Sequence, residues 1–217
     1  MNLAEPAAAL TDLALGLLAL GLALRLRRSP WVCRHWARSF TWAGIAALAG
    51  FVHHGWIKHV GGDVETASWA VISFMVVVAV SYVLAGTVHD VLGPGHARTF
   101  WVLRSAGLLA YAVAAALGHP GIVTMLACEG ITMTLVVALW TMAARRGDPR
   151  ARPVMWAIAA SIGAAVVRGA AGGRTFPLTF DADALYHLAQ MPGLILLARA
   201  VRIRVPGAEA KGGSQRI

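Results

Sequence analysis

Ionisable side chains lie within several long apolar stretches of this sequence, where a charge is costly. They are Asp12, His53, His54, Glu129, Arg168, Asp183 and His187. A charged side chain at the centre of a membrane-spanning helix costs at least about 2.5–3.5 kcal/mol. Each of these residues therefore needs a partner or a function.

Two of these residues are spaced to act together on one helix. Asp183 and His187 are four residues apart, which places them one turn apart on the same helix face. A carboxylate and an imidazole can ligate one zinc ion, with a histidine from another helix as the third ligand and water as the fourth. His54 and His187 would both lie roughly 7 Å below the outer membrane surface. The sequence therefore predicts a metal site formed by His53 or His54 together with Asp183 and His187.

Other roles for the acidic residues near the start of the last span remain open at this point. Asp181 or Asp183 can cap the N-terminus of that helix and interact favourably with its dipole. Arg168 can form an ion pair with Asp183 or Asp12.

The composition requires lipid as the solvent for most of the chain. The 217 residues are 58% hydrophobic and 13% charged, and the mean hydropathy is +0.66, so one water-soluble globule cannot bury the apolar surface. A helix needs about twenty apolar residues to cross roughly 30 Å of hydrocarbon. The stretches that qualify are 7–26, 37–59, 67–88, 99–118, 120–144, 154–173 and 182–202. The predicted fold is an all-α bundle of seven transmembrane helices over residues 1–204, followed by a disordered cytoplasmic tail over 205–217.

The distribution of basic residues predicts the orientation, because Lys and Arg in loops resist translocation. One side holds five in 25–38, Arg98, four in 145–152 and five from Arg199 onward, and the other side holds Lys58, Arg168 and Arg174. We therefore expect the N-terminus outside and the C-terminus inside, in the cytoplasmic (inner) membrane of a bacterium. The net charge of +9 arises from these loop clusters, so membrane lipid rather than nucleic acid is the expected partner.

The last predicted span carries a resemblance to a known family. Its segment DADALYHLAQMP, at 181–192, resembles the last-helix motif of the seven-helix lipid hydrolase superfamily, which includes alkaline ceramidases, GPI-anchor remodelling hydrolases and progestin/adipoQ receptors. That motif has two histidines four residues apart, with an aromatic residue just before the second. Asp183, Tyr186 and His187 stand at these positions.

The second predicted span is similar to the same superfamily. The superfamily has a histidine at the far end of its second helix and an acidic residue at the start of the third. The segment FVHHGWIKHVGGDVE supplies His53 or His54, followed by Asp63 and Glu65. The chain departs from the family pattern four residues before this histidine, where Ala49 or Gly50 replaces a serine.

The resemblance implies a zinc-dependent hydrolase of lipid amide or ester bonds at the outer leaflet. It implies zinc bound by His53 or His54, Asp183 and His187. It also implies roles in catalysis for Asp63 or Glu65 as the proton acceptor and for Glu129 as a group of the substrate pocket.

Two other functions remain open from the sequence. Two transmembrane histidines, His54 and His187, can ligate a haem iron axially in an electron-transfer protein. A non-enzymatic receptor-like protein or transporter can use the same polar cluster only to hold helices together, and the missing serine favours this alternative. A retinal protein is excluded, because neither lysine, Lys58 or Lys211, lies inside an apolar stretch.

Overall fold

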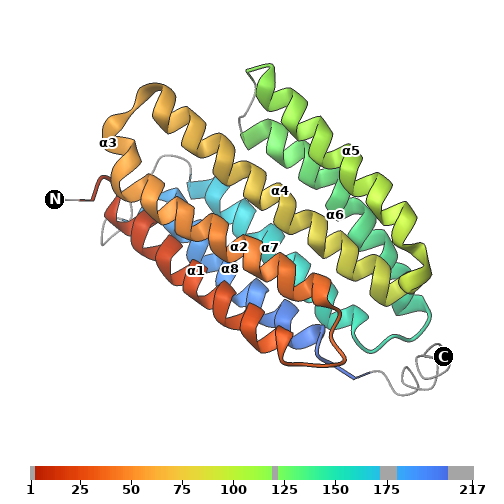
Figure 1. The fold of residues 1–217 in the computed structure, drawn as a ribbon. Helices are drawn as coiled ribbons and strands as arrows, with labels where there is room; N and C mark the ends of the chain where they lie inside the picture. The colour runs from red at the N-terminus through yellow and green to blue at the C-terminus, as the bar shows by residue number, and fades with distance from the viewer. Residues whose placement is uncertain (1–2, 119–121, 172–179, 205–217) are drawn as a thin grey trace.

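The computed structural model describes residues 3–118, 122–171 and 180–204, which form an all-helical bundle (Figure 1). The seven long helices are α1 (Pro6–Arg27), α2 (Arg34–Val52), α4 (Gly62–Leu92), α5 (Ala97–Ala116), α6 (Ile122–Arg145), α7 (Ala151–Ala171) and α8 (Ala182–Ala200). A π-helical turn, η1 (His53–Ile57), and the short α3 (Lys58–Val60) continue α2, and a 3-10 turn, η2 (Pro94–His96), precedes α5. The predicted all-α class is confirmed. The predicted tail at 205–217 and Arg174 lie outside the described residues.

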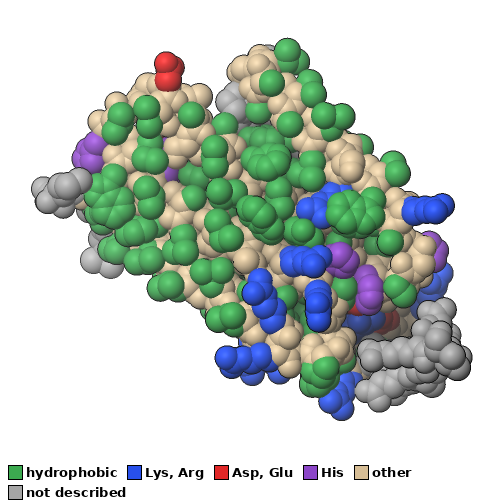
Figure 2. Space-filling view, in the orientation of Figure 1, with side chains coloured by type: hydrophobic (Ala, Val, Ile, Leu, Met, Phe, Trp, Pro, Cys, Tyr) green, Lys and Arg blue, Asp and Glu red, His purple; other side chains and the backbone are tan. Residues whose placement is uncertain are grey.

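Among the residues that the structure describes, four helices are long and apolar enough to cross a membrane. They are α1, α4, α7 and the continuous segment Pro94–Ala116, which contains α5. Large apolar side chains point outward from them, such as Leu17 at 60% exposed and Val102 at 69%. Figure 2 shows apolar side chains over most of the visible face, with Lys and Arg gathered toward one end. A surface of this kind is compatible with an integral membrane protein.

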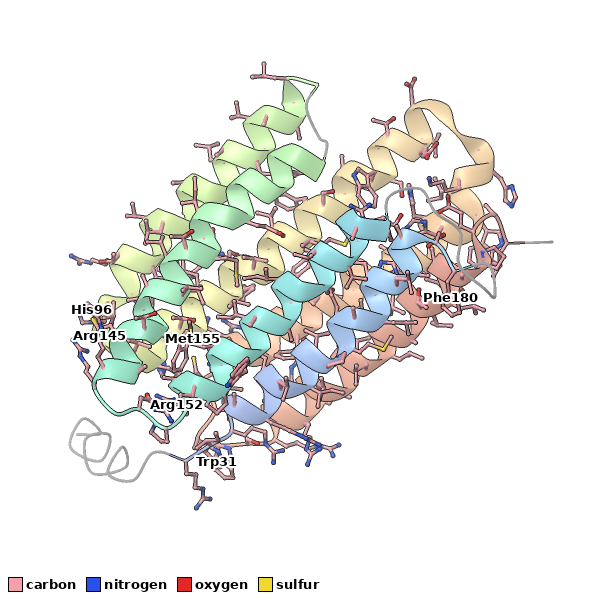
Figure 3. All side chains as sticks on the ribbon, turned by 180° about the vertical axis from the view of Figure 1, so that it is seen from behind. Trp31, His96, Arg145, Arg152, Met155 and Phe180 are labelled. Atoms are coloured by element: carbon pink, nitrogen blue, oxygen red, sulfur yellow. The ribbon has the colours of Figure 1, made fainter. Side chains whose placement is uncertain are left out.

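The main hydrophobic core lies at the end of the bundle where the arginines gather, which we call the basic end. Here α1, α4, α6 and α8 finish and α2, α5 and α7 begin. Trp36 and Trp140 are fully buried in this core. Their indole N–H groups donate to Asp90 Oδ2 at 2.9 Å and to Thr87 Oγ1 at 3.1 Å, as buried tryptophans require. Figure 3 shows Trp31, Arg145 and Arg152 at this end and Phe180 at the opposite end.

Glycines allow α1 and α2 to approach closely. A Cβ added to Gly16 would lie 2.9 Å from Leu48 Cδ2, and one added to Gly44 would lie 2.7 Å from Leu20 Cγ. Small residues at helix contacts are typical of membrane bundles, because they let the backbones pack directly. Since α1 also contacts α8, the ends of α1, α2 and α8 opposite the basic end lie side by side.

Candidate functional site

A π-helical turn carries both histidines of the second helix. In η1, His53 is 2% exposed and His54 is 5% exposed. Such turns are rare and are found frequently at functional sites. The backbone before α1 binds this turn: Ala4 N–H donates to Gly55 O and Glu5 N–H donates to His54 O, both at 3.0 Å. The N-terminal segment therefore fixes the position of η1.

His54 and His187 face one buried carboxylate on α1. Asp12 is only 4% exposed. Its Oδ1 lies 3.3 Å from His187 Nε2, and its Oδ2 lies 3.9 Å from His54 Nε2. The centroids of the two imidazole rings are 6.2 Å apart. Three helical segments thus bring Asp12, His54 and His187 together, and we call these three residues the Asp12 cluster.

The second ring nitrogen of His54 is held by Glu5. His54 Nδ1 contacts Glu5 Oε2, and Lys58 Nζ lies 3.2 Å from Glu5 Oε1. Burial opposes ionisation of Glu5, but the hydrogen bond and charge of His54 and the charge of Lys58 outweigh it and hold the pKa of Glu5 below its ordinary value. Glu5 is therefore a carboxylate and accepts the Nδ1 proton of His54.

The second ring nitrogen of His187 is held by Thr11. His187 Nδ1 lies 3.2 Å from Thr11 Oγ1. Because the Thr11 hydroxyl donates to the carbonyl of Ala7 at 2.8 Å, its oxygen accepts from Nδ1. When both rings are neutral and carry their proton on Nδ1, the lone pairs of His54 and His187 Nε2 point toward the Asp12 carboxylate. Three acceptors that face one another in a buried site need a shared cation, either a proton or a metal ion.

Gly50 makes room for this carboxylate. A Cβ at Gly50 would collide with Oδ2 of Asp12. The serine that the resemblance expects four residues before His54 would stand at this position. The Asp12 carboxylate therefore fills the space of the missing side chain and supplies an oxygen there from a different helix.

Two of the predicted ligands border the cluster with partners of their own. Asp183 forms an ion pair with Arg168 of α7, which is one of the alternatives that the sequence leaves open. His53 Nδ1 lies 3.1 Å from Ser68 Oγ of α4, and its ring packs against Trp69. Asp181 is the cap of α8, as its Oδ1 accepts from the backbone N–H of Ala184 at 2.7 Å.

The residues predicted for catalysis lie in two separate places. Asp63 and Glu65 are in the first turn of α4, where Asp63 is exposed and Glu65 is half-buried. Lys58 Nζ lies 3.5 Å from Glu65 Oε1 and also contacts Glu5. Lys58 therefore links Glu65, but not Asp63, to the residue that holds His54.

Glu129 lies on α6 beside a small cavity of about 10 Å³ that is also lined by Arg104 of α5 and Ser81 of α4. The Arg104 guanidinium carbon lies 4.1 Å from the centre of the Tyr82 ring. Glu129 Oε1 and Arg104 Nε and Nη1 are buried without a hydrogen-bond partner. Glu129 and Arg104 are therefore buried polar groups beside a small, mainly apolar cavity between α4, α5 and α6.

Asp12, Glu5 and Thr11 are the site residues that sequence spacing does not reveal. Each reaches its histidine across a long stretch of chain, so no local motif pairs them. Asp12 has one indication of its own, because an aspartate inside an apolar run is costly unless it has a partner. Its place beside His54 and His187 depends on the close packing of α1 against α2 and α8.

These features define a membrane-compatible helical bundle with a buried histidine and carboxylate cluster at the end opposite its basic end. The chain matches the Family of unknown function (DUF6962) over residues 7–205 and belongs to that family. No curated protein and no solved structure matches the chain. The matched region contains the whole Asp12 cluster.

Proposed function

We propose that this protein is a metal-dependent membrane hydrolase that cleaves lipid amide or ester bonds at the outer leaflet. The observation that carries the proposal is the convergence of the Nε2 atoms of His54 and His187 on the Asp12 carboxylate. Two imidazoles and one carboxylate are the protein ligands of many catalytic zinc sites, which keep a fourth position for water or substrate. We therefore propose Asp12, His54 and His187 as the ligands. In this set Asp12 replaces Asp183, and His53 is not a ligand.

The distances support this ligand set in part. Zinc bonds of about 2.0–2.2 Å in a tetrahedral site place neighbouring ligand atoms roughly 3.3 Å apart. The Asp12–His187 pair is at 3.3 Å, whereas the Asp12–His54 pair is at 3.9 Å. Among the residues that the structure describes, no group of three or more His, Cys, Asp and Glu side chains is already arranged to hold a metal ion. Binding would thus draw the His54 ring toward Asp12.

The partners of the two histidines also support a metal site. Metal-binding histidines almost always donate their other ring N–H to a carboxylate or another oxygen, which fixes the tautomer and the ring orientation. Glu5 has this role for His54, and Thr11 has it for His187. A zinc ion in such a site supplies a Lewis acid and activates water at neutral pH.

Glu65 is the proposed proton acceptor, in preference to Asp63. Lys58 holds Glu65 and Glu5 at the same rim of the site, while Asp63 is exposed. Glu129 is given no part in the proposed reaction, because its cavity between α4, α5 and α6 has room for about one water molecule and not for a lipid.

All seven long helices are proposed to span the membrane, with the N-terminus outside. Four of them meet the length and apolarity that a span requires, and the basic end would face the cytoplasm. The Asp12 cluster would then lie in the outer part of the membrane, where a lipid can approach it between helices.

A purely structural cluster is the second candidate, since shared protons can also satisfy Asp12, His54 and His187. Three helical segments already meet at these residues, and such contacts stabilise membrane bundles. A bis-histidine haem is disfavoured, because the Asp12 carboxylate stands beside both Nε2 atoms, where the iron and porphyrin would lie.

Metal analysis of the detergent-purified protein distinguishes the two candidates. We expect about one zinc ion per wild-type chain, and loss of that zinc in Asp12→Asn, His54→Gln and His187→Gln. His53→Gln and Asp183→Asn are the matched controls, because they remove a neighbouring imidazole and a neighbouring carboxylate, and both should retain zinc. Metal-free wild-type protein would favour the structural alternative, whereas equal loss of zinc in the controls would refute the proposed ligand set.

Hydrolysis is tested on the same variants. Fluorescent lipids with an amide-linked or an ester-linked acyl chain are supplied in mixed micelles, before and after chelation. We expect turnover that chelation removes and zinc restores, and that is absent in His187→Gln. Zinc-loaded protein that leaves both lipids intact would refute the proposed reaction while leaving the metal site in place.

A further inference from the structure

An open hollow of about 610 Å³ lies at the basic end, between the last turn of α1 and the end of α8. It is far from the Asp12 cluster, which lies at the other end of the bundle. The residues that matter for its chemistry are Gly21, Leu24, Arg25, Arg28, Trp31 and Arg202.

One face of α1 supplies both an apolar and a basic part of this hollow. Gly21, Leu24, Arg25 and Arg28 follow the i, i+3, i+4, i+7 spacing of a single helix face. Leu24 is 56% exposed, and no atom lies within 4 Å of the place where a Cβ on Gly21 would stand. The face therefore runs from an open apolar groove on the membrane side to two arginines at the helix end.

Arg202 completes the basic part from the turn that follows α8. The indole N–H of Trp31 donates to the Arg202 carbonyl at 3.2 Å, which holds this residue beside the end of α1. The Trp31 ring also lies 4.1 Å from the Arg204 guanidinium carbon. Arg202 Nε is buried and has no hydrogen-bond partner, although a guanidinium N–H in this position normally binds an acceptor.

The positive charge of the hollow is uncompensated within the described part of the chain. No acidic residue among the described ones lines it. The described arginines that form ion pairs are Arg150 and Arg168, and neither of them lines the hollow. Basic side chains at the C-terminal end of a helix interact favourably with its dipole. That interaction does not account for a buried, unpaired Nε on Arg202, so an anionic acceptor is the group that fits.

We propose that this hollow binds the phosphate of an anionic membrane phospholipid, with an acyl chain lying along Gly21 and Leu24. Basic pockets between helices on the cytoplasmic side are suited to anionic headgroups, because each arginine near the surface adds attraction for them. A phospholipid matches both parts of the α1 face, whereas a soluble phosphate would match only the arginines.

The test compares lipids on the detergent-purified full chain. Phosphatidylglycerol and phosphatidylcholine with identical acyl chains are titrated, and bound lipid is counted by native mass spectrometry. We expect phosphatidylglycerol to bind at least about tenfold more tightly to the wild type. The variant Arg25→Gln/Arg28→Gln/Arg202→Gln should lose this preference.

A matched variant separates the hollow from general charge. Arg98→Gln/Arg145→Gln/Arg146→Gln removes the same charge from exposed positions of the basic end and should keep the preference for phosphatidylglycerol. Equal loss in both variants, or no preference in the wild type, would overturn the proposal, as would displacement of the lipid by soluble glycerol phosphate. Equal melting temperatures in lipid-free detergent show that each variant is folded, and the result is independent of zinc binding at the Asp12 cluster.

Discussion

At the scale of single residues, the position of Asp12 depends on the absence of a side chain at Gly50. The Asp12 carboxylate occupies the volume that a Cβ would take, and this brings it within reach of His54 and His187. A buried carboxylate between two imidazoles is held there only if α1 and α2 keep their close packing. The geometry of the cluster and the stability of the bundle are therefore coupled at one glycine.

Gly50→Ala is expected to destabilise the protein by about 1–3 kcal/mol, which is typical of overpacking a tight site. It should also abolish zinc binding, because the Asp12 carboxylate has to move. The matched control is Gly163→Ala in α7, where nothing lies within 4 Å of the added Cβ. Alanine there should be neutral or stabilising by up to about 1 kcal/mol. Unfolding in detergent and metal content measure both effects, and similar stability of the two variants would contradict this account of Gly50.

Residue types and spacing suffice to indicate His187 and the pair His53 and His54, because histidines inside apolar runs are unusual and lie at similar depth, but they do not decide between His53 and His54. They do not distinguish which neighbouring groups face these rings. Asp183 is one turn from His187, yet Arg168 engages it, and Asp12 reaches His187 from another helix. Pair formation across helices depends on helix rotation, which local spacing does not determine.

At the scale of the elements, Arg150 ties the loop between α6 and α7 to α4, because it binds one carboxylate of the loop and one of α4. Asp148 accepts from the backbone N–H of Arg150 at 2.8 Å and from its Nε at 3.1 Å. Arg150 Nη1 also lies 3.2 Å from Asp90 Oδ2, and Asp90 accepts from Trp36. One arginine thus connects the loop to α4 and, through Asp90, to α2.

This loop predicts a specific pH dependence of stability. Burial opposes ionisation of Asp148, but hydrogen bonds and charge from Arg150 outweigh it and lower the pKa of Asp148 below its ordinary value of 3.8. A carboxyl whose pKa is lower in the folded state stabilises the protein above its ordinary pKa, and this stabilisation is lost as the pH falls through the folded-state pKa. Asp148→Asn should therefore cost about 0.5–1.5 kcal/mol at neutral pH and less at about pH 3.

Melting temperatures of the wild type and Asp148→Asn in detergent, at neutral pH and at about pH 3, measure this difference in stability. The exposed Asp63→Asn serves as the control and should change stability by less than about 0.5 kcal/mol. If Asp148→Asn is less stable than the wild type by the same amount at both pH values, ionisation of Asp148 does not contribute to the difference.

The sequence predicts the helices well and their irregularities poorly. The predicted span at 7–26 corresponds to α1 (Pro6–Arg27), and α8 starts at residue 182, as predicted. Long apolar runs bounded by Gly, Pro and Arg suffice for this. The π-turn at His53–Ile57 is not predicted, because it adds no distinctive residue type. It is supported by bonds from the N-terminal segment, which are tertiary contacts.

At the scale of the whole molecule, polar groups divide between two ends with different chemistry. The basic end carries arginines from the ends or starts of most helices, whereas Asp12, His54 and Glu65 lie at the other end. The four helices that are apolar enough to span a membrane run between these ends. Because positive loops stay in the cytoplasm, this division predicts the orientation that both proposed sites require.

Single cysteines test the orientation in a background in which both native cysteines are replaced, Cys33→Ser/Cys128→Ser. Asp63→Cys, in the first turn of α4, should react with a membrane-impermeant maleimide in intact cells. Arg98→Cys, in the first turn of α5, should react only after the cells are permeabilised. Both positions are exposed, so solvent access does not bias the comparison. The reverse pattern would place the Asp12 cluster on the cytoplasmic side, and labelling of both positions in intact cells would show that α4 does not cross the membrane.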